Sequence, residues 1–248
     1  MYPKLVNHRK IVDHGHTMHL SRLGDGLVGF LGQVGFENVS TLHGDSIDTL
    51  SPSGKSFDGA RTSTALVDES TIDMFYAKQE KEVDGANMWR YQEIWRQSSY
   101  ARAPGAVVTE KITDGSAPFI FHDDGAYYLY FHRNVDGIHH IVVRTSGTLD
   151  ELAWAKETIL ERREHTLSMP SVIRLRDTFW MTCEELVDGK WQTILLSSKS
   201  PQNSFRNTGI VLLQYPCAYQ HVIDGKVVVT YSKKTKEGWE LWAAESEE

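Results

Sequence analysis

Cysteine is scarce in this chain. Its 248 residues include two cysteines, Cys183 and Cys217, whereas small secreted scaffolds that depend on disulfides carry many more. We therefore expect both to be reduced thiols in the core. No paired-Cys spacing of a zinc site is present either, and we expect neither a metal nor another cofactor.

Long apolar runs and an excess of positive charge are also missing. No segment approaches the roughly 20 apolar residues that cross a bilayer, and the opening MYPKLVNHRK lacks the apolar stretch of a signal peptide. The 33 acidic and 26 basic residues give a formal net charge of −7, which argues against a nucleic-acid or acidic-membrane surface. We expect a cytoplasmic protein that binds neither nucleic acid nor membrane. The oligomeric state is left open.

Helix and the common catalytic loops are scarce too. One segment, LDELAWAKETILERREH, has a helix-compatible pattern, and there we expect a single helical turn at Asp150 to Leu152 followed by strand. The sequence has no Gly-rich phosphate loop and no Gly-x-Ser-x-Gly elbow. These absences argue against a nucleotide-binding α/β enzyme and a serine hydrolase.

What the chain does contain is a repeat. An apolar strand, a tight turn and a second apolar strand recur in five segments: Met18–Gly32, Thr62–Ala77, Ser116–Phe131, Ser168–Cys183 and Cys217–Ser232. The turns fall at Asp25, Glu69, Asp124, Asp177 and Asp224, about 50 residues apart, which is the length of one four-stranded propeller blade. We predict an all-β, five-bladed propeller of four-stranded antiparallel blades, forming a single domain over residues 1–248.

The chain ends predict how the ring closes. The last repeat leaves residues for only one further strand, Trp239–Glu245, whereas a strand-like segment, Tyr2 to Val12, precedes the first repeat. A blade with an unpaired edge is unfavourable. We therefore expect the N-terminal strand to complete the fifth blade beside the C-terminal strand.

The repeats carry a resemblance to a known superfamily. SMPSVIRLRDTFWMT and SAPFIFHDDGAYYLYF resemble the inner strands of furanosidase-type propellers, which include glycoside hydrolase family 43 and, more distantly, families 32 and 68. The resemblance is strong across about residues 112–235 and weaker before residue 60. It implies a hydrolase of carbohydrate metabolism that acts on a glycoside or sugar-like small molecule in the axial funnel, with carboxylates at the inner strand ends as acid and base.

The chain departs from that family where the acids should lie. The Asp-Pro that opens such strands is replaced by Ala117-Pro118 in the third repeat and by Met169-Pro170 in the fourth. Alanine and methionine side chains exchange no protons, so any catalytic residues are non-standard. We expect furanosidase activity of the usual kind to be weak or missing.

Histidines and acids near the strand entrances are the remaining candidates. In an extended segment His14 and His16 point the same way, a spacing that suits a metal or a shared proton transfer; backbone-bonded strand-entry histidines are the plain alternative. The resemblance implies that His221 faces the axis. We expect catalytic roles for Asp13, His14, Asp114 and His221, and substrate contacts from His16, His19, Arg61, His132, His165, Glu184 and Tyr219.

Each loop carboxylate also has a simple structural interpretation as a solvated or turn-forming residue. The tryptophans Trp89, Trp95, Trp154, Trp180 and Trp191 are expected to fill spaces between blades rather than to stack on sugars. Three functions stay open: a glycoside-acting enzyme with relocated carboxylates, a small-molecule biosynthetic enzyme that uses His and Asp as acid and base, and a non-catalytic carbohydrate-binding propeller.

Overall fold

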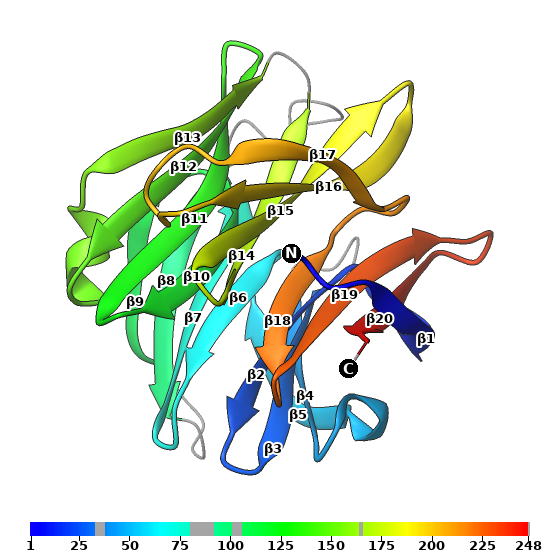
Figure 1. Ribbon diagram of the computed structural model, residues 1–248. Coiled ribbons are helices and arrows are strands. Elements are labelled where there is room, and N and C mark those ends of the chain that lie inside the picture. The colour runs from blue at the N-terminus through cyan, green and yellow to red at the C-terminus, as the bar shows by residue number, and fades with distance from the viewer. Residues whose placement is uncertain (33–37, 80–91, 101–105, 164–165, 248) are drawn as a thin grey trace.

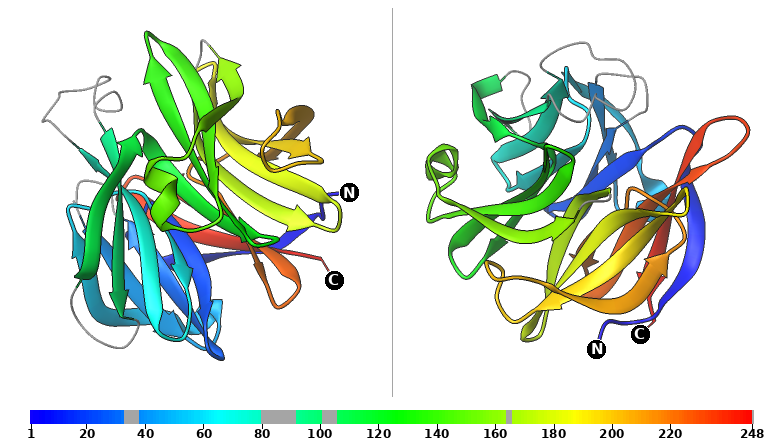
Figure 2. Two further views of the ribbon diagram at one scale, coloured as in Figure 1. Left: turned by 90° about the vertical axis from the view of Figure 1, so that its left-hand side faces the viewer. Right: turned by 90° about the horizontal axis from the view of Figure 1, so that it is seen from above.

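The strands of this protein form five separate antiparallel sheets. The computed structural model describes residues 1–32, 38–79, 92–100, 106–163 and 166–247, and within them each sheet has four strands. The sheets stand around a common axis as the blades of a propeller (Figures 1 and 2). The predicted all-β, five-bladed propeller is thus confirmed.

The blades follow one another along the chain, each running from the axis outward. The first contains β2 (Thr17–Leu23), β3 (Gly26–Gly32), β4 (Asn38–Gly44) and β5 (Ser51–Asp58). The second contains β6 (Ser63–Val67), β7 (Thr71–Gln79), β8 (Gln92–Tyr100) and β9 (Ala106–Asp114). The third contains β10 (Ser116–Asp123), β11 (Ala126–Val135), β12 (Ile138–Ser146) and β13 (Glu157–Arg163).

The fourth blade contains β14 (Leu167–Leu175), β15 (Thr178–Val187), β16 (Lys190–Ser198) and β17 (Arg206–Leu213). The fifth contains β18 (Tyr219–Ile223), β19 (Lys226–Lys234), β20 (Trp239–Ser246) and, from the other end of the chain, β1 (Leu5–Val12). Two short 3₁₀ helices lie among the described residues, η1 (Ile47–Thr49) and η3 (Asp150–Ala153). The second confirms the helical turn expected there.

The repeat seen in the sequence is the inner hairpin of each blade. In the third and fifth blades its turn has positive φ at two successive residues, 50° and 73° at Asp124 and Gly125 and 51° and 78° at Asp224 and Gly225. This is the geometry of a type I′ turn, whose twist matches that of the flanking strands. Asp-Gly suits it because both residues tolerate positive φ better than most.

Apolar side chains on both faces of each blade explain why the sheets stack. A separate buried cluster fills each of the five spaces between neighbouring blades. Between the first two blades, for example, Val28 and Phe30 of β3 pack with Ile72 and Met74 of β7. No blade could bury both faces alone, so each is stabilised by its two neighbours.

The N-terminal strand closes the ring. β1 runs antiparallel to β20, with Leu5 opposite Ser246 and Val12 opposite Leu241 (Figure 1). Just before β1, the hydroxyl of Tyr2 donates a hydrogen bond of 3.0 Å to the side-chain oxygen of Gln220 on β18. The predicted closure by the N-terminal strand is confirmed.

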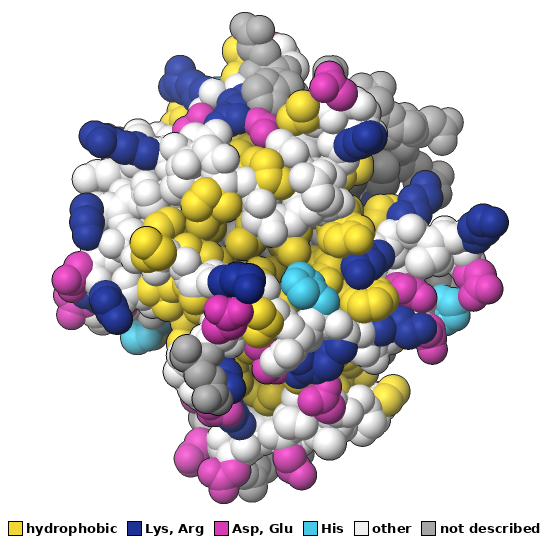
Figure 3. Space-filling model, turned by 45° about the vertical axis from the view of Figure 1, so that its right-hand side comes forward, with side chains coloured by type: hydrophobic (Ala, Val, Ile, Leu, Met, Phe, Trp, Pro, Cys, Tyr) yellow, Lys and Arg dark blue, Asp and Glu magenta, His cyan; other side chains and the backbone are white. Residues whose placement is uncertain are grey.

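Charges of both signs are distributed over the surface. Figure 3 shows one face on which hydrophobic side chains gather toward the middle and most Lys, Arg, Asp and Glu side chains lie nearer the edges. Among the described residues, no helix has the length and apolar character to cross a membrane. Cys183 and Cys217 are both buried and free, as expected of core residues that form no disulfide.

Candidate functional site

The inner strands begin around a common hollow at one end of the axis. This hollow, called the funnel below, has a volume of about 390 Å³. Residues from all five blades line it: His16, Thr62, His132, Asn134, His139, Thr166, Ser168, Met169, Glu184, Trp191, Pro216, Cys217 and Trp239. Three histidines, one carboxyl, one thiol and two indoles therefore face one cavity.

Three strand entrances share an unusual backbone conformation. Ala117, Met169 and Cys217 have φ of 49°, 52° and 57°, a left-handed conformation that costs a non-glycine residue about 1–2 kcal/mol. In the third and fourth blades the ladder register shifts between Ser116 and Phe119 and between Ser168 and Ser171, as in a β-bulge, which re-aims a side chain. Met169 and Cys217 accordingly line the funnel.

Glu184 on β15 is the acidic group of this cavity. Its side chain accepts a hydrogen bond of 2.7 Å from the Ser168 hydroxyl and one of 2.5 Å from the backbone N–H of Cys217. Burial raises the pKa of Glu184, and hydrogen bonds from the Cys217 thiol, the Ser168 hydroxyl and the Cys217 N–H partly oppose that shift. The carboxyl is thus held in place by two neighbouring strand entrances and retains its proton more readily than an exposed glutamate.

Cys217 lies between this carboxyl and a histidine. Its Sγ is 3.1 Å from Nε2 of His16, and the His16 ring meets that of Trp239 edge-on at 5.0 Å. Burial, and then the Glu184 charge, raise the pKa of the Cys217 thiol well above its usual value. Burial lowers the pKa of His16 to about 4. At neutral pH the pair is a thiol beside a neutral imidazole, not the thiolate and imidazolium of a cysteine nucleophile.

A second funnel histidine is also neutral. His132 lies on β11 and is 2% exposed, and burial lowers its pKa to about 3. Its ring is roughly parallel to that of His139, with centroids 6.2 Å apart, and the side-chain nitrogen of Asn134 is 2.9 Å from Nε2 of His139. The funnel wall therefore offers uncharged donors and acceptors.

Of the predicted site residues, His16, His132 and Glu184 meet in the funnel, whereas Asp13 and His14 lie outside it. Both are exposed, and the Asp13 carboxylate is 2.6 Å from Nζ of Lys10 on β1. The reason is the path of the chain, which crosses here from the outer strand of the fifth blade to the inner strand of the first. Asp13 starts this crossing and His16 ends it.

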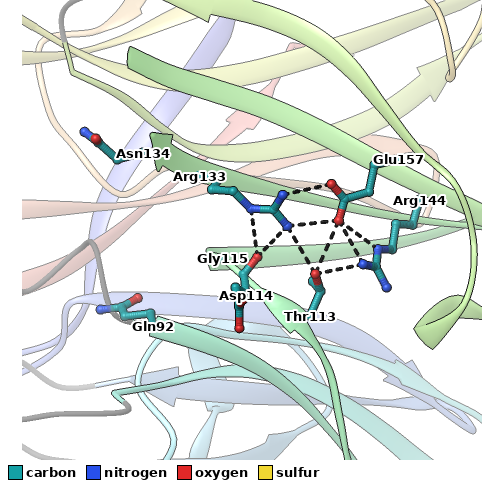
Figure 4. Close-up of a pocket in the computed structure, with 8 residues that line it drawn as sticks. All are labelled: Gln92, Thr113, Asp114, Gly115, Arg133, Asn134, Arg144 and Glu157. Atoms are coloured by element: carbon teal, nitrogen blue, oxygen red, sulfur yellow. Dashed lines mark hydrogen bonds and ion pairs between the residues drawn. The ribbon is translucent and has the colours of Figure 1, made fainter. Parts of the chain in front are cut away.

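Asp114 also lies outside the funnel. It lines a cleft of about 470 Å³ between the second and third blades. Its carboxylate is 2.8 Å from Nζ of Lys111 and points away from the group formed by Arg133, Glu157 and Arg144 (Figure 4). Both arginines bind Glu157, at 2.9 Å and 2.8 Å. The two arginines share this one carboxylate, and both also bond to the Thr113 hydroxyl on β9, so the group joins two blades.

Three more predicted residues lie deeper along the axis. Tyr219, His19 and His221 are 0%, 6% and 6% exposed, and with Phe119 they form a packed group of rings, called the plug below. The His19 ring is 5.7 Å from Phe119, 6.3 Å from Tyr219 and 5.0 Å from His221. His19 and His221 line a cavity at the opposite end of the axis, and neither lines the funnel.

Arg61 and His165 complete the predicted set. Arg61 directly precedes Thr62, which lines the funnel, but is not itself among the lining residues. His165 lies outside the described residues.

Several features of the funnel were not predictable from the sequence. Cys217 and His16 are 201 positions apart, and only closure of the ring brings them together. Trp191 was expected between blades but lines the funnel. Trp154 was also expected between blades, yet it is 88% exposed because η3 projects from the outer edge. Trp180 does pack between the fourth and fifth blades, whereas Trp89 lies outside the described residues.

No metal site emerges from the side chains that the structure places. Among them, no group of three or more His, Cys, Asp or Glu is arranged to hold a metal ion.

Comparison with known proteins identifies the fold. No family model and no curated protein sequence matches this chain. Solved structures do match, and the fold is that of the five-bladed propeller enzymes of glycoside hydrolase families 43 and 32.

Three structures illustrate the likeness. The endo-arabinase from Bacteroides thetaiotaomicron has a TM-score of 0.75 at 12% identity, covering 98% of this chain and 96% of its own. The compost-metagenome xylosidase/arabinofuranosidase CoXyl43, in complex with xylotriose, gives 0.73 at 11%, covering 98% and 95%. The GH43 protein BlXynB from Bacillus licheniformis gives 0.69 at 10% and covers 94% of this chain. This chain spans 56% of the length of BlXynB.

Proposed function

We propose that this protein is a carbohydrate-active enzyme that binds a sugar or sugar-like small molecule in the funnel and uses Glu184 as its proton-transferring group. The observation that carries the proposal is the Glu184 carboxyl, fixed by Ser168 and Cys217 in a cavity of otherwise uncharged polar groups. A raised pKa suits a general acid at neutral pH.

The rest of the funnel suits a neutral hydroxylated ligand. The neutral imidazoles of His16 and His132 offer one donor and one acceptor each. The hydroxyl oxygen of Thr62 is buried without a hydrogen-bond partner among the described residues, and a ligand hydroxyl would satisfy it. Trp191 and Trp239 add apolar ring surface. The neighbours that share this fold act on xylan- and arabinan-type sugars by name, which supports the choice of ligand class.

The chemistry differs from hydrolysis by two flanking carboxyls. Such hydrolysis needs a pair of carboxyl groups about 5–9.5 Å apart, and the described residues give the funnel one. We therefore assign Glu184 the transfer of a proton to or from a substrate oxygen, with the imidazoles binding neighbouring hydroxyls. Aryl arabinofuranosides and aryl xylosides should turn over slowly.

Glu184→Gln is the variant that tests the proposal. Wild type and variant are screened against xylo- and arabino-oligosaccharides and other glycosides, by product analysis and by calorimetric binding. We expect the variant to lose about 10²-fold or more in turnover while it still binds the sugar. Glu237→Gln, at an exposed glutamate of the β19–β20 turn, is the matched control and should behave as wild type. Equal turnover in the Glu184 variant would overturn the role of this carboxyl.

A non-catalytic sugar-binding propeller is the second candidate, favoured by one observation. Met169 lines the funnel at the strand entrance where the resemblance calls for an acid. If wild type binds sugars and turns over no glycoside in the screen, the binding module replaces the enzyme.

A further inference from the structure

A second cavity lies at the opposite end of the propeller axis. This cavity, called the far mouth below, has a volume of about 570 Å³ and is lined by the closing ends of the five inner strands, β2, β6, β10, β14 and β18. The plug of Phe119, Tyr219, His19 and His221 lies between the far mouth and the funnel, and the two cavities share no lining residue. The far mouth is therefore a separate site.

The base of the far mouth carries two histidines with opposite hydrogen-bonding roles. His221 donates a hydrogen bond to the backbone carbonyl of Met18, and its Nε2 is buried without a partner among the described residues. Nδ1 therefore carries the hydrogen, and Nε2 is a free acceptor. The backbone N–H of Ala65 donates to Nδ1 of His19 at 3.3 Å, so Nε2 of His19 carries the hydrogen and is a donor.

Both imidazoles are neutral at physiological pH. Burial lowers the pKa of His221 to about 3 and that of His19 well below its usual value. The two rings meet edge to face, with centroids 5.0 Å apart. A hydroxylated molecule at the base of the cavity can thus donate to one ring and accept from the other, which would satisfy an acceptor that is costly to bury unpaired.

The rim of the far mouth is rich in arginine. Arg22, Arg174 and Arg176 line it together with one acidic residue, Asp123. Arg22 is paired with Asp224, and Arg174 is 2.8 Å from the Asp123 carboxylate. Arg176 is exposed and has no ion pair in the part of the chain that the structure describes. A guanidinium in this position binds carboxylate or phosphate oxygens in a bidentate manner.

We propose that the far mouth is a second ligand site that binds a small hydroxylated anion, such as a hydroxycarboxylate or a phosphorylated polyol. The ligand's anionic group contacts the arginine rim through Arg176, and its hydroxyl groups reach the His19–His221 pair. The plug keeps this ligand apart from whatever occupies the funnel.

The histidine resonances report on the proposal directly. In the ¹⁵N-labelled protein, long-range ¹H–¹⁵N spectra distinguish the protonated from the bare nitrogen of each imidazole, and variants His19→Gln and His221→Gln assign the signals. Gluconate and glycerol 3-phosphate are titrated separately, with glucose and glycerol as their neutral counterparts. We expect at least one anion to shift the His19 and His221 signals saturably, and the neutral compounds to leave them in place.

Arginine variants test the rim without disturbing the core. Arg176→Ala should weaken binding of the active anion about three- to fivefold. Arg206→Ala, at an exposed arginine on the outer strand β17, should leave the affinity unchanged, as should Glu184→Gln in the funnel. The proposal is overturned if neither anion moves the two signals, if the neutral compounds move them equally, or if both arginine variants weaken binding alike.

Discussion

At the scale of single residues, three strand entrances of the funnel share a backbone conformation but hold different side chains. Ala117, Met169 and Cys217 share a left-handed backbone in which none of these residue types is favoured. Such strain persists where the surrounding structure imposes it, and it is concentrated at functional sites. These entrances hold a methyl group, a thioether and a thiol, which leaves Glu184 as the carboxyl among the described residues that line the funnel.

Glu184 should contribute to stability in a pH-dependent way. Its folded pKa lies above the ordinary value of 4.5, so its contribution is full below pH 4.5 and is lost as the pH rises through the folded pKa. Glu184→Gln removes this titration. Relative to wild type, the variant's free energy of unfolding should therefore rise between pH 4 and pH 8, as measured by urea unfolding. A constant difference across this range would contradict the raised pKa.

Both thiols should be unreactive in the folded protein. Cys183 and Cys217 are 1% and 4% exposed, and burial raises the pKa of both. Because the thiolate is the reactive form, an aromatic disulfide reagent at pH 8 should label neither in the folded protein within an hour and both in 6 M guanidinium. Cys217→Ala should reduce the denatured count by one. Rapid labelling of the folded wild type would show that the funnel opens to its thiol.

At the scale of structural elements, ion groups between blades matter as well as apolar contacts. Glu157 on β13 binds Arg133 and Arg144, while both arginines also bond to Thr113 on β9 of the preceding blade. Glu157→Gln leaves two partly buried guanidinium groups without their anion. We expect the free energy of unfolding to fall by about 1–3 kcal/mol, measured by urea unfolding at pH 7, and Glu237→Gln to change it by less than about 0.5 kcal/mol.

The closing strand β1 should contribute strongly to the stability of the ring. Removal of residues 1–12 deletes β1, leaves β20 with an unpaired edge and removes the Tyr2 contact to Gln220. We expect the melting temperature to fall by more than 10 °C, or the protein to aggregate through the exposed edge. Deletion of Met1 alone is the control and should have no effect. Equal melting temperatures for the 1–12 deletion and wild type would mean that the ring closes without β1.

These elements also mark what a single sequence predicts. Turn residues such as Asp124 and Asp224 and the spacing between repeats predicted five blades, because hairpin chemistry is local. The pairing of Cys217 with His16 was not predictable, since it depends on closure between distant segments. Asp13 and Asp114 were expected in the funnel because they precede inner strands. They lie outside because each ends or follows an outer strand, which no local pattern reveals.

At the scale of the whole molecule, buried neutral histidines should make the propeller sensitive to acid. His16, His19, His132 and His221 all have lowered pKa values, so they take up protons on unfolding. Their contribution to stability is present above pH 6.5 and lost as the pH falls, by about 1.4 kcal/mol per pH unit for each. The combined effect of the four histidines outweighs the opposite trend of Glu184, whose pKa is raised. We expect cooperative unfolding near pH 5, which circular dichroism would detect. An unchanged melting temperature from pH 7 to pH 4 would contradict this prediction.

The plug separates the two cavities along the propeller axis. Four rings, those of Phe119, Tyr219, His19 and His221, fill the centre where the two cavities would otherwise connect. A molecule that enters the funnel must leave by the same opening, so one bound molecule blocks the next until it departs. Compounds at the two ends cannot exclude one another by occupying the same space, and any influence between them must be transmitted through the protein.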